Sequence, residues 1–185
     1  MENQFLQRAL SQTLTKKDVQ DLAALAPTGK ISVQELFLVC FYKDKPAVAF
    51  RAAWVLEHVE ASYPELFLPI FPEFISSLPQ QQNPSCRRHF TKILLCFVNP
   101  KTDKLHQTAW ATIANREQVA EVVFEWLIHA KTPVAVQVNC LEVLLYLSKE
   151  FSWIKDDLKE QTAFYMKDGS AAMQSRGRKI LHQLQ

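Results

Sequence analysis

The chain has 185 residues, of which 48% are hydrophobic and 22% are charged, and its formal net charge is +2. This composition excludes a disordered chain, which would be poorer in large apolar residues, and the length favours one domain with a substantial core. A net charge this small excludes any overall electrostatic signature of nucleic-acid or membrane binding, so only local charge clusters can indicate either.

The scarcity of glycine predicts an all-helical protein. Only Gly29, Gly169 and Gly177 occur, and a sheet-rich chain of this length would need more glycines for its hairpin turns. Proline, asparagine, aspartate and serine instead come just before helix-forming runs, where helices begin.

The first predicted helix begins at Thr15 and ends at the Pro-Thr-Gly segment 27–29. Ser32 and Glu35 have the spacing of a capping box, in which each side chain satisfies a free backbone donor at the start of the next helix. A third helix is predicted from Pro46 to about Tyr63.

Proline residues shape the next part of the chain. A helix is predicted from Pro64 towards Leu78, but Pro69 and Pro72 interrupt it. Each proline removes a backbone donor and crowds the preceding turn, so this segment is expected to be kinked or partly 3₁₀. A regular helix then follows from Asn83 to Val98.

The second half of the chain begins with a loop and a short helix. We expect a loop at 99–103, followed by these helices: 105–113, 115–129, 133–150, 152–166 and a last one after Ser170. Helices separated by so few residues fold back as antiparallel neighbours.

An apolar pattern recurs along the chain. Its first occurrence is Val48, Ala52, Val55, Leu56 and Val59, which share one helical face. Additions of 38, 88 and 125 residues give three further apolar or small sets: Cys86, Phe90, Ile93, Leu94 and Phe97; Val136, Cys140, Val143, Leu144 and Leu147; Met173, Gly177, Ile180, Leu181 and Leu184. The steps of 38, 50 and 37 residues favour two-helix repeats with one insertion, although any amphipathic helix could match so loose a template by chance.

Several segments resemble HEAT-like repeat proteins. They are 50–56 (FRAAWVL), 64–66 (PEL) and 133–137 (PVAVQ). The C-terminal half, through 123–127 (VFEWL) and 175–181 (SRGRKIL), is similar to a family of small, uncharacterised bacterial HEAT-like proteins. The resemblance covers about 46–184 and implies an all-α fold, an α-α superhelix of about five antiparallel helix pairs like that of HEAT and armadillo solenoids. A single domain over 1–185 with an insertion around 99–115 is expected.

The sequence contains no recognisable catalytic or metal motif. The four cysteines are widely spaced in apolar helical contexts and are expected to be buried thiols, and the five histidines are interpreted as helix-surface residues. Glu57 and Glu60 are interpreted as a solvated face, and Trp54, Trp126 and Trp153 as core residues. We therefore predict no enzyme activity, no cofactor and no metal.

Charge is unevenly distributed. No lysine or arginine lies between Arg51 and Arg87, whereas 87–104 carries a balance of +4 and 171–185 adds three cations without an acid. These runs are either solvated helix faces or a basic stripe for phosphate or an acidic partner. The candidate partner-binding residues are Arg51, Arg87, Arg88, Trp110, Arg176, Arg178 and Lys179.

One row of positions has two interpretations. Arg51, His89, Asn139 and Arg176 each precede a position of the repeated core pattern by one residue. They could form hydrogen bonds between neighbouring repeats, or the arginines could contact an anionic partner.

The leading functional hypothesis is a non-catalytic interaction module that binds another protein through a solenoid surface. Nucleic-acid binding through the basic stripe is the alternative, and a HEAT-like DNA glycosylase is a further one that lacks a matching motif. No stretch is long and apolar enough for a membrane span, and the first residues lack a signal-peptide pattern, so no membrane association and a cytoplasmic location are expected.

Overall fold

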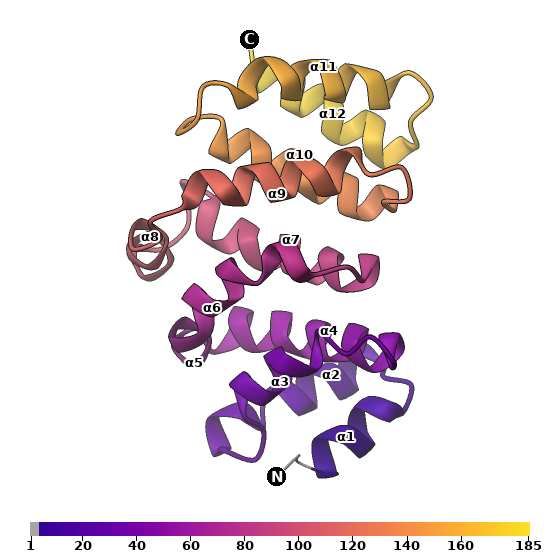
Figure 1. Ribbon diagram of the computed structural model, residues 1–185, viewed down its shortest axis with the longest axis vertical. Helices are drawn as coiled ribbons and strands as arrows, with labels where there is room; N and C mark the ends of the chain where they lie inside the picture. The colour runs from indigo at the N-terminus through magenta and orange to yellow at the C-terminus, as the bar shows by residue number, and fades with distance from the viewer. Residues whose placement is uncertain (1–3) are drawn as a thin grey trace. The chain divides into compact units, whose positions relative to one another are not determined.

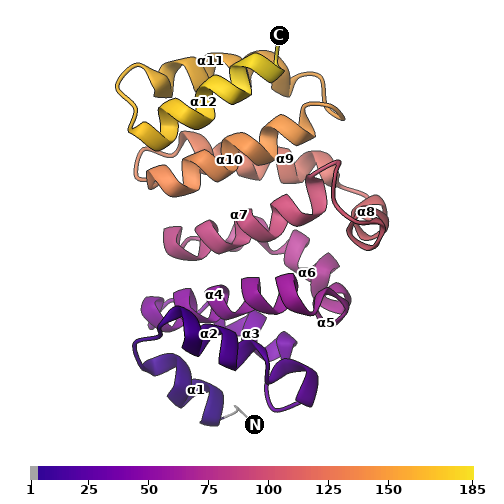
Figure 2. The ribbon, with the colours of Figure 1, turned by 180° about the vertical axis from the view of Figure 1, so that it is seen from behind.

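The computed structural model describes residues 4–185, and these residues form helices, turns and loops without a strand. Figures 1 and 2 show the helices in chain order. The chain divides into two compact units, an N-terminal unit that ends at Ile93 and a C-terminal unit that begins at Leu94. The boundary lies inside one helix, α7 (Pro84–Val98). The extent of one solenoid domain over the whole chain stays a prediction.

The N-terminal unit begins with short helices that surround a long one. Its first elements are α1 (Gln4–Ser11), α2 (Lys16–Ala23), the 3₁₀ helix η1 (Ala26–Thr28), α3 (Val33–Val39) and α4 (Pro46–Ser62). The predicted start at Thr15 is confirmed, because Thr15 accepts from the Asp18 amide and the Asp18 carboxylate accepts from the Thr15 amide at 2.7 Å. Gly29 ends η1 with a φ of 74°, a left-handed conformation that favours glycine.

The proline-rich segment is broken as the sequence predicts. It consists of α5 (Pro64–Phe67), η2 (Leu68–Ile70), α6 (Phe71–Ser76) and η3 (Leu78–Gln80), and α7 follows. Pro69 lies in η2 and Pro72 lies in the first turn of α6. Each break therefore falls where a proline cannot donate a backbone hydrogen bond.

Helix α4 is the centre of the N-terminal unit and packs against α1, α2, α3 and α5. Phenylalanines fill the space around it, with the Phe74 ring centroid 4.8 Å from that of Phe90 and 5.3 Å from that of Phe67. Helix α1 was not predicted from the sequence, and it contributes only two buried residues, Leu6 and Leu10. A helix this short carries too few apolar positions to show a period.

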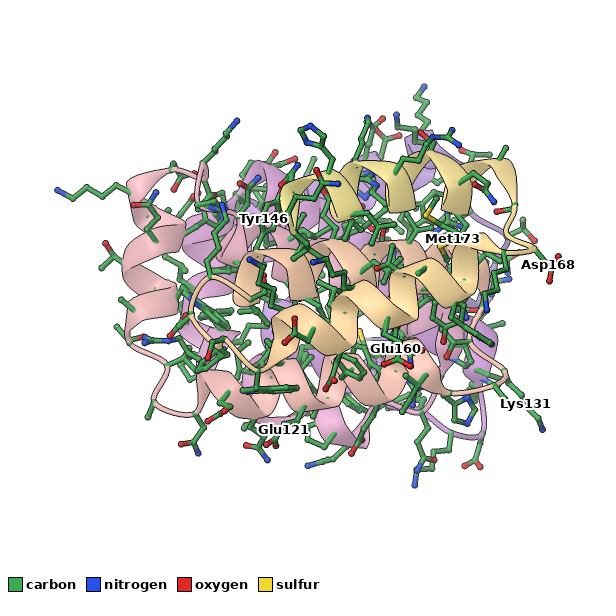
Figure 3. All side chains as sticks on the ribbon, turned by 90° about the horizontal axis from the view of Figure 1, so that it is seen from above. Glu121, Lys131, Tyr146, Glu160, Asp168 and Met173 are labelled. Atoms are coloured by element: carbon green, nitrogen blue, oxygen red, sulfur yellow. The ribbon has the colours of Figure 1, made fainter. Side chains whose placement is uncertain are left out.

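The C-terminal unit contains the rest of α7 and five further helices. They are α8 (Lys104–Ala111), α9 (Arg116–Ile128), α10 (Val134–Leu147), α11 (Ile154–Met166) and α12 (Ala171–Gln183). Helix α8 confirms the short helix expected in the inserted region. Helix α10 packs against α9, α11 and α12. Figure 3 shows α11 and α12 side by side, with the exposed side chains of Glu121 and Lys131 at the periphery.

The neighbours of Gly177 explain why the last copy of the repeated pattern has glycine at this position. A Cβ atom at this position would clash with the Met166 side chain and would lie 3.4 Å from Thr162 Cγ2. Helices α11 and α12 therefore approach closely only because position 177 has no side chain.

The predicted core register is confirmed at Leu56, Leu94 and Leu144, each of which is fully buried. Leu181 is the exception and is half-buried. The periodic pattern thus identified the inward face of each helix, but the degree of burial depends on what packs against that face.

Some burial predictions were wrong. Trp153 is 40% exposed rather than part of the core, and Cys96 is half-buried. His89, His106 and Glu60 were interpreted as surface residues, yet their exposed fractions are 4%, 7% and 1%. Helical periodicity shows which residues share a face, but it does not show which neighbouring element covers that face.

Candidate functional site

A pocket of about 410 Å³ lies in the N-terminal unit between residues of α2, α4 and α7. It combines aromatic rings, histidines, three cations and one carboxylate. Its lining residues are Lys16, Phe50, Trp54, Glu57, His58, Arg88, His89 and Lys92. A larger pocket of about 550 Å³ lies between the loops at 40–46 and 80–84, but Lys43 is the only charged residue among those lining it. We therefore take the smaller pocket, with its richer chemistry, as the candidate site.

Three rings, which we call the aromatic floor, line the pocket. Phe50 and Trp54 are one turn apart on α4, and their ring planes lie within 24° of each other at 6.1 Å. The His89 imidazole, from α7, lies 6.2 Å from the Trp54 ring at an angle of 21° and 5.3 Å from the Phe50 ring. Phe50 and Trp54 are half-buried, so the floor offers ring surface to an occupant.

Glu57 connects α4 to α7. Its carboxylate accepts hydrogen bonds from His89 Nδ1 through one oxygen and from Lys92 Nζ, at 2.8 Å, through the other. His89 and Lys92 lie three residues apart on α7 and therefore share one face. The contact holds the imidazole in one orientation, with Nδ1 as the donor.

Burial and hydrogen bonding determine the charges in this contact. Burial lowers the pKa of His89 below its ordinary value, although Glu57 favours the protonated ring. Burial alone would raise the pKa of Glu57, but the hydrogen bonds from His89 and Lys92 lower it below its ordinary value. At neutral pH the pair is therefore a neutral imidazole and a carboxylate.

The second nitrogen of His89 is unusual. Nε2 is buried and has no hydrogen-bond partner within the described part of the chain. Buried polar atoms in native proteins generally have a partner, so an unpaired one indicates a strained or functional position.

The HEAT repeat domain family matches residues 6–184 of the chain. The chain belongs to the HEAT repeat family. Its fold class is therefore all-α, an α-α superhelix, and the HEAT-like resemblance over about 46–184 is confirmed, because the family match includes all of that range. No curated protein and no solved structure matches the chain. HEAT repeats typically mediate protein interactions and are generally not enzymes.

Three of the predicted partner-binding residues lie in the N-terminal unit of this HEAT protein. Arg88 is exposed and lines the pocket. Arg51 donates to the Leu10 carbonyl at the end of α1, at 3.0 Å. Arg87 donates from Nε to the Gln81 carbonyl at 2.8 Å. Arg88 is thus the one candidate in this unit that the structure places at the pocket.

The other predicted residues lie in the C-terminal unit. Trp110 is half-buried on α8, and Arg178 and Lys179 are exposed on α12. Arg176 pairs with Glu142 of α10, with 2.5 Å between Nη1 and Oε2. The structure therefore divides the candidates between the two units of the HEAT repeat chain, and it gives several of them hydrogen bonds within the protein.

The row of equivalent positions makes contacts between helices. Arg51 reaches α1, His89 reaches α4, and Arg176 reaches α10. Asn139, the fourth member, is half-buried on α10. Arg51, His89 and Arg176 thus carry the kind of hydrogen bond between helices that the first interpretation of the row predicts in a HEAT protein.

Sequence reasoning missed most of the pocket. Lys16 had no signal of its own, Phe50 was noted only within the HEAT-like segment 50–56, and Lys92 only within the basic run 87–104. Glu57 and His89 were interpreted as surface residues. One signal was present, because His89 belongs to the row of equivalent positions and an imidazole at such a position is predicted to contact the preceding repeat. The spacing alone could not identify Glu57 as the residue that His89 contacts.

Within residues 4–185, no three histidine, cysteine, aspartate or glutamate side chains lie in an arrangement that could hold a metal ion. In the same range, none of the helices has the length and apolar character needed to cross a membrane.

Proposed function

We propose that this HEAT repeat chain is a non-catalytic interaction module that binds a protein partner through the surface around the pocket of α2, α4 and α7. The observation that carries this proposal is the aromatic floor of Phe50, Trp54 and His89 with cations beside it. Aromatic and arginine side chains are the residue types that contribute most binding energy at protein interfaces.

The chemistry of the pocket favours binding over catalysis. Glu57 is the carboxylate that could serve as a base, but it accepts hydrogen bonds from His89 and Lys92, and its pKa is lowered. The remaining imidazole nitrogen, His89 Nε2, is buried away from solvent. A general base must reach the proton that it removes, so these groups are placed to hold two helices together and present a surface.

Site-specific photo-crosslinking in the native cell tests the proposal. A photo-reactive amino acid replaces Lys16 at the pocket, and a matched control replaces Lys159, an exposed residue of α11. We expect protease-sensitive crosslinked bands from position 16 that are absent from position 159. Nuclease-sensitive bands at position 16, or the same bands at both positions, would contradict the proposal.

A further inference from the structure

We infer that the pocket of α2, α4 and α7 receives an aromatic side chain of the partner that is flanked by carboxylates. This inference rests on the proposed function and names the chemistry of the partner segment that enters the site. It depends on the shape of the aromatic floor, on the charge around it and on the absence of cations over a neighbouring stretch of the chain.

The floor selects a flat group. Trp54 lies nearly parallel to Phe50, at 24°, and these two half-buried rings carry the ring surface that the pocket offers, whereas the His89 ring is buried beside them. Burial of a guest ring against such a surface removes apolar area from water and adds ring contacts. A purely charged guest would leave this apolar surface uncovered.

The charges around the floor select carboxylates. Lys16, Arg88 and Lys92 line the pocket against one acid, Glu57, and the imidazole of His89 is neutral at pH 7. The formal balance is therefore three positive charges and one negative charge. Glu57 already accepts from His89 and Lys92, so a guest acid meets a net positive rim.

The pocket volume suits one side chain and its neighbours. About 410 Å³ lies near the lower end of the range of roughly 300 to 1,000 Å³ for ligand sites. A single ring fits on the floor, and the flanking residues of an extended segment then reach the cations of α2 and α7. The anchor and its rim resemble the arrangement of an interface hot spot.

The distribution of cations along the chain favours an acidic protein segment over single-stranded nucleic acid. A bound nucleic-acid strand needs cations of the protein along its phosphates over many ångströms. In this unit no lysine or arginine occurs from position 52 to 86, and Glu65 and Glu73 are exposed. This stretch of the chain therefore adds no cation to the three that line the pocket, and three cations suit a short acidic motif.

Fluorescence anisotropy with labelled peptides tests the inference on the full chain. The probe is Gly-Asp-Glu-Tyr-Glu-Asp-Gly, and its two matched controls replace the tyrosine with alanine or all four acids with their amides. A single-stranded oligothymidylate of similar length is the nucleic-acid control. We expect saturable binding of the probe, weakened about tenfold or more by either peptide change.

Protein variants connect the binding to the pocket. Arg88 and Arg178 are both exposed on helices, so R88E and R178E are matched charge reversals in the two units. We expect R88E to weaken probe binding about tenfold or more, because it places like charges together. R178E is expected to leave the affinity for the probe unchanged. Circular dichroism confirms that both variants fold.

Specific results would overturn the inference. The inference is wrong if the probe shows no saturable binding below about 1 mM, or if either control peptide binds as tightly as the probe. It is also wrong if R88E and R178E change probe binding equally, or if the oligothymidylate binds more tightly than the probe in a way that depends on Arg88. If protein crosslinks at position 16 persist while the probe fails, the proposed function stands and this inference alone is wrong.

Discussion

His89 in the N-terminal unit and Arg176 in the C-terminal unit occupy equivalent repeat positions, and each bonds to a glutamate of an earlier helix. The His89 and Glu57 side chains are 6% and 16% exposed, whereas those of Arg176 and Glu142 are 38% and 20% exposed. The contact beside His89 also lies among aromatic rings. One repeat position thus supports a buried contact beside a pocket in one unit and a more exposed ion pair in the other.

The difference teaches that the repeat register determines where a polar contact forms, but the flanking side chains determine what it can do. The Phe50 and Trp54 rings lie beside the His89 ring, with centroids 5.3 and 6.2 Å from it, and His89 Nε2 is buried. In the contact between Arg176 and Glu142, the neighbouring group is the Tyr146 hydroxyl, which donates to Glu142 at 3.3 Å. Exclusion of water strengthens a hydrogen bond and raises the cost of leaving one unpaired.

The largest expected effect is a loss of stability when a core leucine of the repeated pattern, present in both units, is truncated. Leu56→Ala and Leu144→Ala remove fully buried leucines at equivalent core positions, so each is expected to lower the free energy of unfolding by about 2 to 5 kcal/mol. Leu181→Ala is expected to cost less, because Leu181 is half-buried. Chemical denaturation followed by circular dichroism measures the losses. Losses under about 0.5 kcal/mol at Leu56 and Leu144 would show that the shared register is wrong.

The second prediction separates the two polar contacts. Glu57→Ala leaves a buried imidazole donor without its acceptor and is expected to cost about 1 to 3 kcal/mol. The matched change Glu142→Ala breaks a more exposed pair and is expected to cost about 1 kcal/mol or less. The same denaturation experiment compares them. A larger loss for Glu142→Ala would reverse the comparison.

The third prediction concerns pH. Because burial lowers the pKa of His89 in the folded state, the unfolded chain takes up a proton near pH 6.5 that the folded chain does not. Stability should therefore fall as the pH drops below about 6.5, by at most about 1.4 kcal/mol per pH unit from this group. The lowered pKa of Glu57 adds a further loss as the pH falls below about 4.5.

The control for this pH dependence is His89→Gln, which removes the titrating group. Thermal denaturation between pH 7 and pH 5 is expected to show a shallower decrease in stability for this variant than for the unmodified chain. Identical slopes would contradict the assignment of a lowered pKa to His89.

The smallest effects distinguish structural from exposed arginines. Arg51→Ala removes a hydrogen bond to the last turn of α1 and is expected to cost about 0.5 to 1.5 kcal/mol. Arg178→Ala changes an exposed side chain and is expected to stay within about 0.5 kcal/mol of the unmodified chain. Equal melting temperatures for the two variants would show that the contact of Arg51 with α1 contributes nothing.

Much of the fold could be predicted because its signals are local. Prolines, capping residues and apolar periods predicted α2 to α7 and the helices of the C-terminal unit, and the proline breaks near Pro69 and Pro72 were placed correctly. Helix α1 was missed because it has only two buried positions. The candidate site was predicted poorly, and of its eight lining residues only Arg88 was among the candidates.

The sequence by itself determined the helices, their inward faces and the repeat, since capping and periodicity act over a few residues of the same chain. Only the tertiary structure decided that His89 and Glu57 meet, because they lie 32 residues apart on different helices. It also decided that Phe50 and Trp54 line a pocket with Lys16. Contacts between separate helices depend on their packing distance and rotation, which a one-dimensional pattern does not specify.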